Sequence, residues 1–218
     1  MRLTPPVSSR SSRSRAAFTG GALVVALLGA PAAADARVTL SSGHVDAIAA
    51  RVTGGKLRLL VKDATGRSVR WHDPNDVTLR VVSRARTRLP RNGTLRFLGR
   101  PGATVWMIPQ TQRSGIIWAG WNTEEVSRRQ LRNLSWRLNR VSGPGRVAIF
   151  QTGSFGKPSV LFDSSRLPAS RSLPLGIHAH GNWGFTARGT YRMSFTLRGT
   201  ARSGKRLSAT RALTFRVG

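Results

Sequence analysis

The sequence predicts an all-β protein: an antiparallel β-sandwich of the immunoglobulin-like or jelly-roll type, with one short helix. Beyond residue 36, apolar residues recur mainly with a period of two, which is the period of a strand with one buried face. Turn-forming residues such as Gly, Pro, Asn and Asp separate these stretches at short intervals. About a dozen strands in roughly 180 residues are typical of a sandwich.

Residues 1–36 have the pattern of a secretory signal. Four arginines precede an apolar run over residues 16–30, and Ala34-Asp35-Ala36 offers a cleavage site between small residues. The apolar run has about fifteen residues and is interrupted by glycines, so it is shorter than the roughly 20 residues that span a bilayer. We therefore expect a mature chain from Arg37 onward that is secreted, extracellular or associated with the cell wall, without a transmembrane segment.

The mature chain is expected to fold as a single ligand-binding domain over residues 37–218, although the segment from Val160 onward could be a module joined through residues 164–174. Thr53-Gly54-Gly55 indicates a hairpin turn between the first two strands. The expected strands are residues 45–52, 56–61, 77–82, 94–98, 104–109, 116–121, 134–141, 147–150, 160–163, 178–187, 189–199 and 208–217.

One segment departs from the strand pattern. Asn122 or Thr123 can cap a short helix that begins at Glu124, with acidic residues in its first turn and arginines near its end at residue 132. This charge order complements the helix dipole. The sequence therefore predicts one helix here.

The composition excludes several classes of protein. The chain has no cysteine, so it forms no disulfides, thiol nucleophiles or cysteine-ligated zinc sites. It has only 8 Asp and Glu and no common nucleotide-binding or hydrolase motif. Carboxylate pairs for glycoside hydrolysis would have to come from Glu124 and Glu125, Asp73 and Asp76, or Asp163. We expect a protein that is not an enzyme, and a hydrolase remains the weaker alternative.

The chain is strongly basic, with 36 Lys and Arg and a formal net charge of +28, of which +25 remains after removal of residues 1–36. The arginines are scattered singly through the expected strands rather than gathered in one stripe, which does not favour specific nucleic-acid binding. Adhesion to polyanions, such as anionic cell-wall polymers, is the expected consequence of the charge.

Histidines provide the strongest candidate for a ligand site. His178 and His180 are spaced i and i+2, so in a strand their imidazoles project from the same face about 7 Å apart. His44 and Asp46 have the same spacing. Together the four residues could form a nitrogen and oxygen ligand set for zinc, with manganese as a second possibility. The alternative is that the His178 and His180 side chains bond to loop backbone or face solvent.

Tryptophans indicate a second possible site. Trp106, Trp118 and Trp121 alternate with aliphatic residues, and most of them are expected in the core. A ligand-stacking role for Trp118 and Trp121, with Asn182, would instead indicate a module that binds carbohydrate or an anionic wall polymer.

Several segments carry a resemblance to a known family. They are Gly43-His44-Val45-Asp46, Asp73-Pro74-Asn75-Asp76-Val77, Phe97-Leu98-Gly99, Val105-Trp106-Met107-Ile108-Pro109-Gln110, Trp118-Ala119-Gly120-Trp121-Asn122-Thr123-Glu124 and Val141-Ser142-Gly143-Pro144-Gly145, followed by the stretch from His178 to Thr186 and by Gly189-Thr190-Tyr191. In this order they resemble the actinobacterial surface-anchored repeat family, also called choice-of-anchor M domain proteins, over nearly the whole mature chain.

The resemblance implies an exported, non-enzymatic binding protein that works beside an ABC uptake system. Its expected partner is the substrate-binding component of an ABC transporter of the metal-ion type, and His178 and His180 would be direct metal ligands. Unlike anchored members, this sequence shows no sorting signal or membrane tail at its C-terminus. We therefore expect a diffusible form, or one held to the wall by charge.

Overall fold

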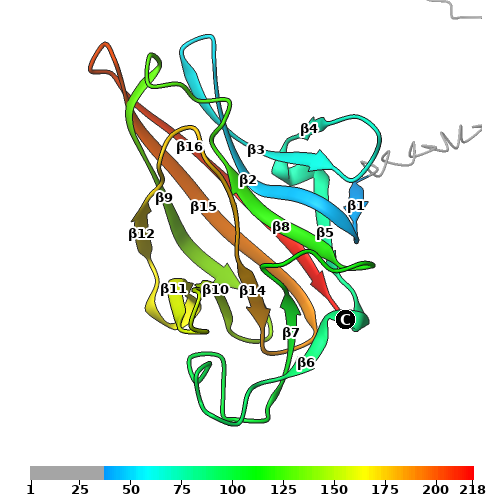
Figure 1. The fold of residues 1–218 in the computed structure, drawn as a ribbon. Coiled ribbons are helices and arrows are strands. Elements are labelled where there is room, and N and C mark those ends of the chain that lie inside the picture. Colours follow the sequence, from blue (N-terminus) through cyan, green and yellow to red (C-terminus); the bar gives the residue numbers. More distant parts are fainter. Residues whose placement is uncertain (1–36) are drawn as a thin grey trace, which may run out of the picture. The chain divides into compact units, whose positions relative to one another are not determined.

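Strands make up nearly all the regular structure of the protein, as a computed structural model of residues 37–218 shows (Figure 1). The expected signal segment, residues 1–36, lies outside the described residues. Residues 37–218 belong to one compact unit. No helix in this part of the chain is long and apolar enough to cross a membrane.

The strands form three sheets. The six-stranded sheet has the order β1-β5-β16-β15-β9-β12, with the bounds Val38–Leu40, Val77–Val81, Arg206–Val217, Gly189–Ala201, Leu131–Ser142 and Ala169–Ser172. A five-stranded sheet has the order β13-β8-β2-β3-β4, with the bounds His178–His180, Ile117–Asn122, Gly43–Thr53, Lys56–Ala64 and Arg70–His72. A second five-stranded sheet has the order β11-β10-β14-β7-β6, with the bounds Pro158–Asp163, Val147–Thr152, Asn182–Phe185, Thr104–Ile108 and Arg86–Arg88.

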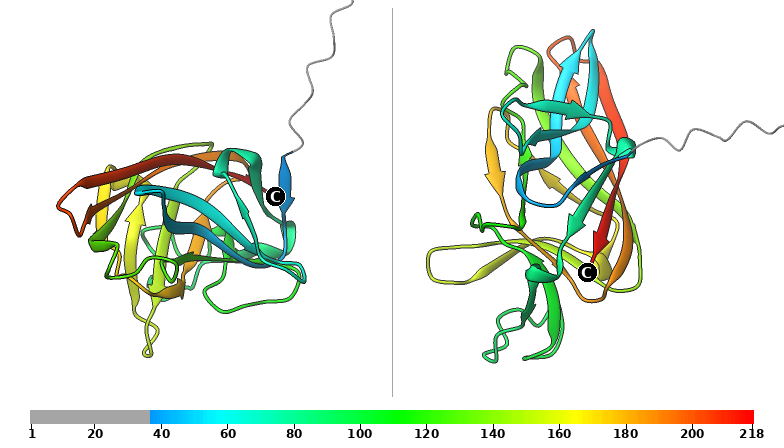
Figure 2. Two further views of the ribbon diagram at one scale, coloured as in Figure 1. Left: turned by 90° about the horizontal axis from the view of Figure 1, so that it is seen from above. Right: turned by 90° about the vertical axis from the view of Figure 1, so that its right-hand side faces the viewer.

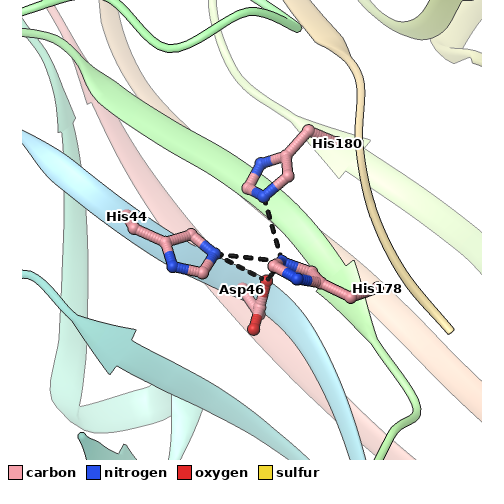
Figure 3. Close-up of side chains that lie close together, drawn as sticks. All are labelled: His44, Asp46, His178 and His180. Atoms are coloured by element: carbon pink, nitrogen blue, oxygen red, sulfur yellow. Dashed lines mark hydrogen bonds and ion pairs between the residues drawn. The ribbon is translucent and has the colours of Figure 1, made fainter. Parts of the chain in front are cut away.

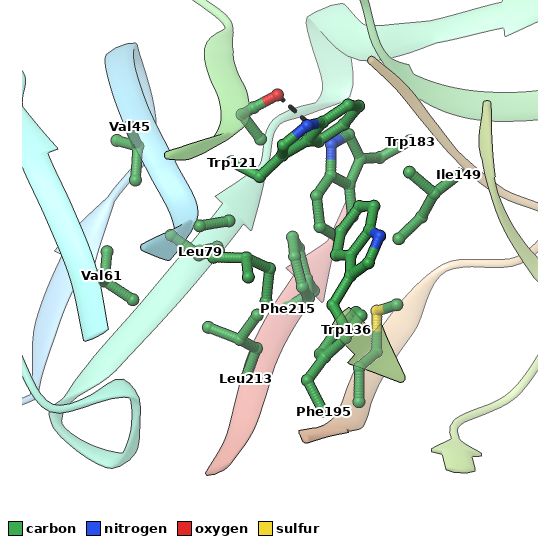
Figure 4. Packing of buried hydrophobic residues seen from close by; sticks show 14 of the residues in the cluster. Val45, Val61, Leu79, Trp121, Trp136, Ile149, Trp183, Phe195, Leu213 and Phe215 are labelled. Carbon is green, nitrogen blue, oxygen red and sulfur yellow. Dashed lines mark hydrogen bonds between the residues drawn. The ribbon is translucent and has the colours of Figure 1, made fainter. Parts of the chain in front are cut away.

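The core lies between the layers. In Figures 1 and 2 the hairpin of β2 and β3 covers one side of the long strands β15 and β16, and β3 contacts both of them. Alternate residues of β15 are fully buried, as the period of two requires: Tyr191, Met193, Phe195 and Leu197. Aromatic rings from several strands fill the centre (Figure 4); for example, the Trp121 and Trp136 ring centroids are 5.0 Å apart.

The prediction of an all-β sandwich is confirmed, and the sheets add a feature that the sequence did not indicate. Most strand pairs are antiparallel, as expected, but β1 with β5, β5 with β16, and β2 with β8 are parallel. The pairing of β2 with β8 is important for the candidate site, because it brings together segments that are far apart in the sequence.

Some predicted elements differ from the structure at short or irregular segments. The strand predicted over residues 94–98 is wrong: these residues form successive turns, with Leu98 N–H donating to Leu95 O at 2.9 Å. Their apolar side chains serve a small separate cluster in which Leu98 packs on Phe150 and its neighbours. Four short strands, β1, β4, β6 and β12, were not predicted because three or four residues carry too little alternation.

The predicted helix at Glu124 is also wrong. Residues 124–130 form turns that lead directly into β9, and residues 37–218 contain only three-residue 3₁₀ turns as helical structure. Asn122 Oδ1 accepts the Glu124 N–H at 2.9 Å, but this bond closes a turn and not a helix. The Thr123 hydroxyl donates to Pro174 O at 2.7 Å and accepts the Ile177 N–H at 3.0 Å, which ties the segment to the chain before β13. Tertiary contacts therefore override the local helix signal.

Candidate metal site

Three neighbouring strands position the candidate site. Strand β8 lies between β2 and β13, parallel to β2 and antiparallel to β13. In this register Gly120 on β8 is opposite Asp46 on one side and opposite His180 on the other. Val45 is a core residue, so its neighbours His44 and Asp46 project from the outer face of this sheet, as do His178 and His180 beside Ala179.

The four predicted ligand residues converge (Figure 3). The Nε2 atom of His178 lies 3.0 Å from Nε2 of His44 and 3.0 Å from Nε2 of His180. Asp46 Oδ1 is 2.9 Å from His178 Nε2 and 3.3 Å from His44 Nε2. One ligand atom from each of the four residues lies within 4.8 Å of all the others. The group could therefore hold a metal ion.

Asp46 is the most unusual member of this group. Its exposed fraction is 0%, and neither of its carboxylate oxygens accepts a hydrogen bond. A buried carboxylate without donors carries a large desolvation cost unless a cation compensates it. The neighbouring imidazoles cannot supply enough protons, because His178 Nε2 faces three partners and carries at most one hydrogen. A bound cation would satisfy all four groups at once.

The distances also suit a small ion. Zinc bonds to imidazole nitrogen at about 2.0–2.1 Å, so the ligand atoms of a tetrahedral site are roughly 3.3 Å apart. The four separations given above run from 2.9 to 3.3 Å. The remaining two separations, which join His180 to His44 and to Asp46, are bounded only by the 4.8 Å that the whole group spans, so His180 has to move toward Asp46 to complete a tetrahedron.

His180 is held in the form that binds metals. Burial, together with the nearby positive charge that His178 and His44 would carry, lowers the pKa of His180 from 6.5 to about 4. The imidazole is therefore neutral near pH 7, with a lone pair available for coordination. The side chains of His44 and His178 are 24% and 28% exposed, so the cluster is open to solvent on one side.

Trp118 forms one wall of the cluster. Its ring stacks on His180 with centroids 3.6 Å apart and an angle of 9° between the planes, and its centroid is 5.2 Å from that of His44. The indole Nε1 donates to Gln110 O at 2.7 Å, which fixes the orientation of the ring. Trp118 therefore positions the His180 imidazole from the side.

Gly120 provides the space beneath the His180 ring. A Cβ atom at this position would lie 2.8 Å from His180 Cε1, 2.9 Å from Nδ1 and 2.7 Å from Ala179 O. These distances are too short for any residue with a side chain. Glycine inside a strand often marks such a close approach, and that signal in the sequence could have identified Gly120.

The residues predicted for the alternative stacking site do not form a common surface. Trp121 is 4% exposed and belongs to the core, so its predicted role as a stacking platform is wrong. Trp118 is engaged with His180 in the metal cluster. The amide of Asn182 bonds within the fold, with Oδ1 accepting the Gln110 N–H at 2.9 Å and Nδ2 donating to Thr152 Oγ1 at 3.2 Å.

His72, the remaining histidine of the chain, lies away from the cluster beside Asp63, with 3.5 Å between Nε2 and Oδ2. Hydrogen bonds from the Thr65 amide and hydroxyl help to lower the pKa of Asp63, against the opposing effect of burial. Because His72 contacts Asp63 and neither residue belongs to the group of four ligand residues, the two form an ion pair separate from the candidate metal site.

No family model matches the chain, and neither a curated protein nor a solved structure matches it. What the fold and the site define is an all-β protein with a three-histidine, one-aspartate cluster that could hold a metal ion. The resemblance to the surface-anchored repeat family stays a prediction.

Proposed function

We propose that this protein binds a divalent transition metal, and most favourably zinc, at His44, Asp46, His178 and His180. The observation that carries the proposal is Asp46, a fully buried carboxylate that accepts no hydrogen bond. Its Oδ1 lies 2.9 Å from His178 Nε2 and 3.3 Å from His44 Nε2, and His180 completes the group. Three nitrogens and one oxygen suit tetrahedral zinc, whereas manganese prefers a larger set of oxygen ligands.

The role that fits this site is binding rather than catalysis. A catalytic zinc keeps one position open for water or substrate, and here four protein groups can fill a tetrahedral shell. The partial exposure of His44 and His178 leaves a route for the ion to enter and leave. These features support a protein that takes up and releases metal. The signal-like residues 1–36 extend the proposal to an exported protein, and the resemblance to the surface-anchored repeat family is the ground for proposing the substrate-binding component of an ABC uptake system as the partner that receives the metal.

The carbohydrate alternative gains no support from the structure. It required exposed tryptophans on one face with the histidines elsewhere, but Trp121 is buried and the histidines meet beside Trp118. We therefore place Trp118 in the metal site as a positioning residue.

Isothermal titration of the purified protein with zinc and with manganese tests the proposal. We expect one zinc ion per chain and weaker binding of manganese. His178→Gln combined with His180→Gln should abolish zinc binding, whereas the control His72→Gln changes a histidine outside the cluster and should keep it. Zinc binding that survives the double substitution, or that is lost equally in the control, would refute this site.

A further inference from the structure

The outer face of the six-stranded sheet has an unusual composition. Alternation turns the core residues of β15 and β16 inward and leaves the residues between them facing outward. Across the sheet these form continuous rows, because Arg198 is opposite both Ser208 and Ser135, and Thr200 is opposite both Arg206 and Asn133. Hydrogen-bonding side chains and guanidinium groups therefore alternate over this face.

The positive charge of this face is not neutralised within the sheet. None of its six strands contains an Asp or Glu. Among residues 37–218, only two arginines form ion pairs with carboxylates, Arg51 with Glu125 and Arg211 with Asp73. We call the outward-facing arginines of the sheet the arginine face; its members are Arg80, Arg137, Arg140, Arg192, Arg198, Arg206 and Arg216.

A hollow lies within the arginine face, at the level of the rows that contain Arg198 and Thr200. Its volume is about 350 Å³, and its lining includes Arg198, Arg206, Asn133, Thr200 and Ser208. Guanidinium groups bind phosphate oxygens with paired N–H donors, and hydroxyl and amide groups can donate to the remaining oxygens. The hollow therefore has the chemistry of a site for a phosphate group.

Aromatic side chains are missing from the same surface. The four aromatic residues of these strands, Trp136, Tyr191, Phe195 and Phe215, are all buried in the core. Proteins that bind single-stranded nucleic acid combine a basic groove with exposed aromatic rings on which the bases stack. This face offers charge and hydrogen bonds alone, which favours a polymer without bases.

We propose that the arginine face binds a flexible polyanion that carries phosphate groups along its chain, with one phosphate seated in the hollow between Arg198 and Arg206. The remaining arginines of the face attract the phosphates on either side of it. This binding is independent of the metal site, because the metal ligands lie on the outer face of the β13-β8-β2-β3-β4 sheet and β3 packs on the inner side of β15 and β16.

Titration with fluorescently labelled inorganic polyphosphate tests the proposal through anisotropy. Arg198→Gln with Arg206→Gln should weaken binding about tenfold. Each phosphate contact to a single strand contributes about 0.7 to the slope of log K against log salt concentration. Because Arg198 and Arg206 share one phosphate, their substitution should reduce that slope by about 0.7. The control is Arg91→Gln with Arg100→Gln, two exposed arginines of the loop before β7, which removes the same charge. The control should change affinity by less than about twofold.

Three other outcomes of these titrations would overturn the proposal. Equal weakening by both pairs would show attraction by net charge only and would overturn the proposal. Tighter binding of a single-stranded oligonucleotide than of polyphosphate, or binding to anionic lipid vesicles but not to polyphosphate, would also overturn it. If the first pair fails to fold, Arg192→Gln with Arg216→Gln tests the same face. Zinc titration of each variant should be unchanged, so failure here is distinguishable from failure of the metal proposal.

Discussion

Replacing Gly120 with alanine tests whether the cluster depends on the space under His180. The added Cβ would lie 2.8 Å from His180 Cε1 and 2.7 Å from Ala179 O. Carbon atoms pack at about 3.5–4.0 Å, so the ring has to move by roughly 0.7–1.2 Å. Metal sites tolerate deviations of only about 0.2 Å in their bond lengths. We therefore expect zinc affinity to fall about 10- to 100-fold, as it does when outer-shell support is lost.

The assay is thermal or urea unfolding with and without zinc. At a zinc concentration 100 times the original Kd, the original protein should gain about 2.7 kcal/mol of unfolding free energy, and a variant that binds 100-fold more weakly should gain only about 0.4 kcal/mol. Overpacking against Ala179 O will also cost about 1–3 kcal/mol in the metal-free state. Because the metal-induced gain is measured within each variant, that cost cancels.

The matched control is Gly66→Ala, since a Cβ at Gly66 meets nothing within 4 Å. This variant should show the full metal-induced gain. If Gly120→Ala gains as much stability from zinc as the original protein does, the inference that Gly120 makes room for a liganding His180 is wrong.

Three further predictions concern the same cluster. Asp46→Asn should abolish zinc binding yet raise the stability of the metal-free protein by about 1–3 kcal/mol, because it removes a fully buried charge that accepts no hydrogen bond and has only the imidazoles of His44 and His178 beside it; a less stable metal-free variant in urea unfolding would contradict this. Trp118→Leu removes the stack on His180 and should weaken zinc binding about tenfold by calorimetry, whereas Trp106→Leu, in another sheet, should not. The pKa of His180 is lowered to about 4, so between pH 6.5 and 4 the unfolded chain binds more protons than the folded chain does. The metal-free protein should therefore lose stability as the pH falls through this window and keep its stability above pH 6.5. Urea unfolding at several pH values measures this loss, which should be shallower in His180→Asn.

The ligand residues could be predicted from the sequence because their spacing is local. Side chains at i and i+2 of a strand share a face, and this made the pairs His44 with Asp46 and His178 with His180 visible. What the sequence could not show is that the two pairs meet, because His44 and His178 are 134 residues apart and are joined only through the pairing of both strands with β8. Such non-local pairing depends on the packing of the whole sandwich.

The tryptophans show a limit of a different kind. Trp118 and Trp121 are three residues apart, so in a regular strand they lie on opposite faces, and the structure places Trp121 in the core and Trp118 beside the histidines. The spacing of the two tryptophans in the sequence shows that they lie on opposite faces of the strand. However, the residues around them are apolar on both faces, so the sequence did not indicate which tryptophan faces the core. The predicted helix failed for a related reason, since the Thr123 hydroxyl is used in contacts with residues 174 and 177 that no local pattern shows.

The two proposed sites both depend on one property of the sandwich. One face of each sheet packs in the core, and the other face points outward. The residues on two outer faces can therefore differ in chemistry without disturbing the packing of the inner faces. Among residues 37–218, the strands of the metal-site sheet contain Asp46 and Asp63, and Asp73, Glu124 and Glu125 follow its strands within three residues. The strands of the six-stranded sheet contain no carboxylate, and only Asp76, directly before β5, lies within three residues of them. Carboxylates near the cluster offset the repulsion of a metal ion by the arginines of this basic chain. Since the two faces share no polar partner, substitutions on one should be additive with substitutions on the other.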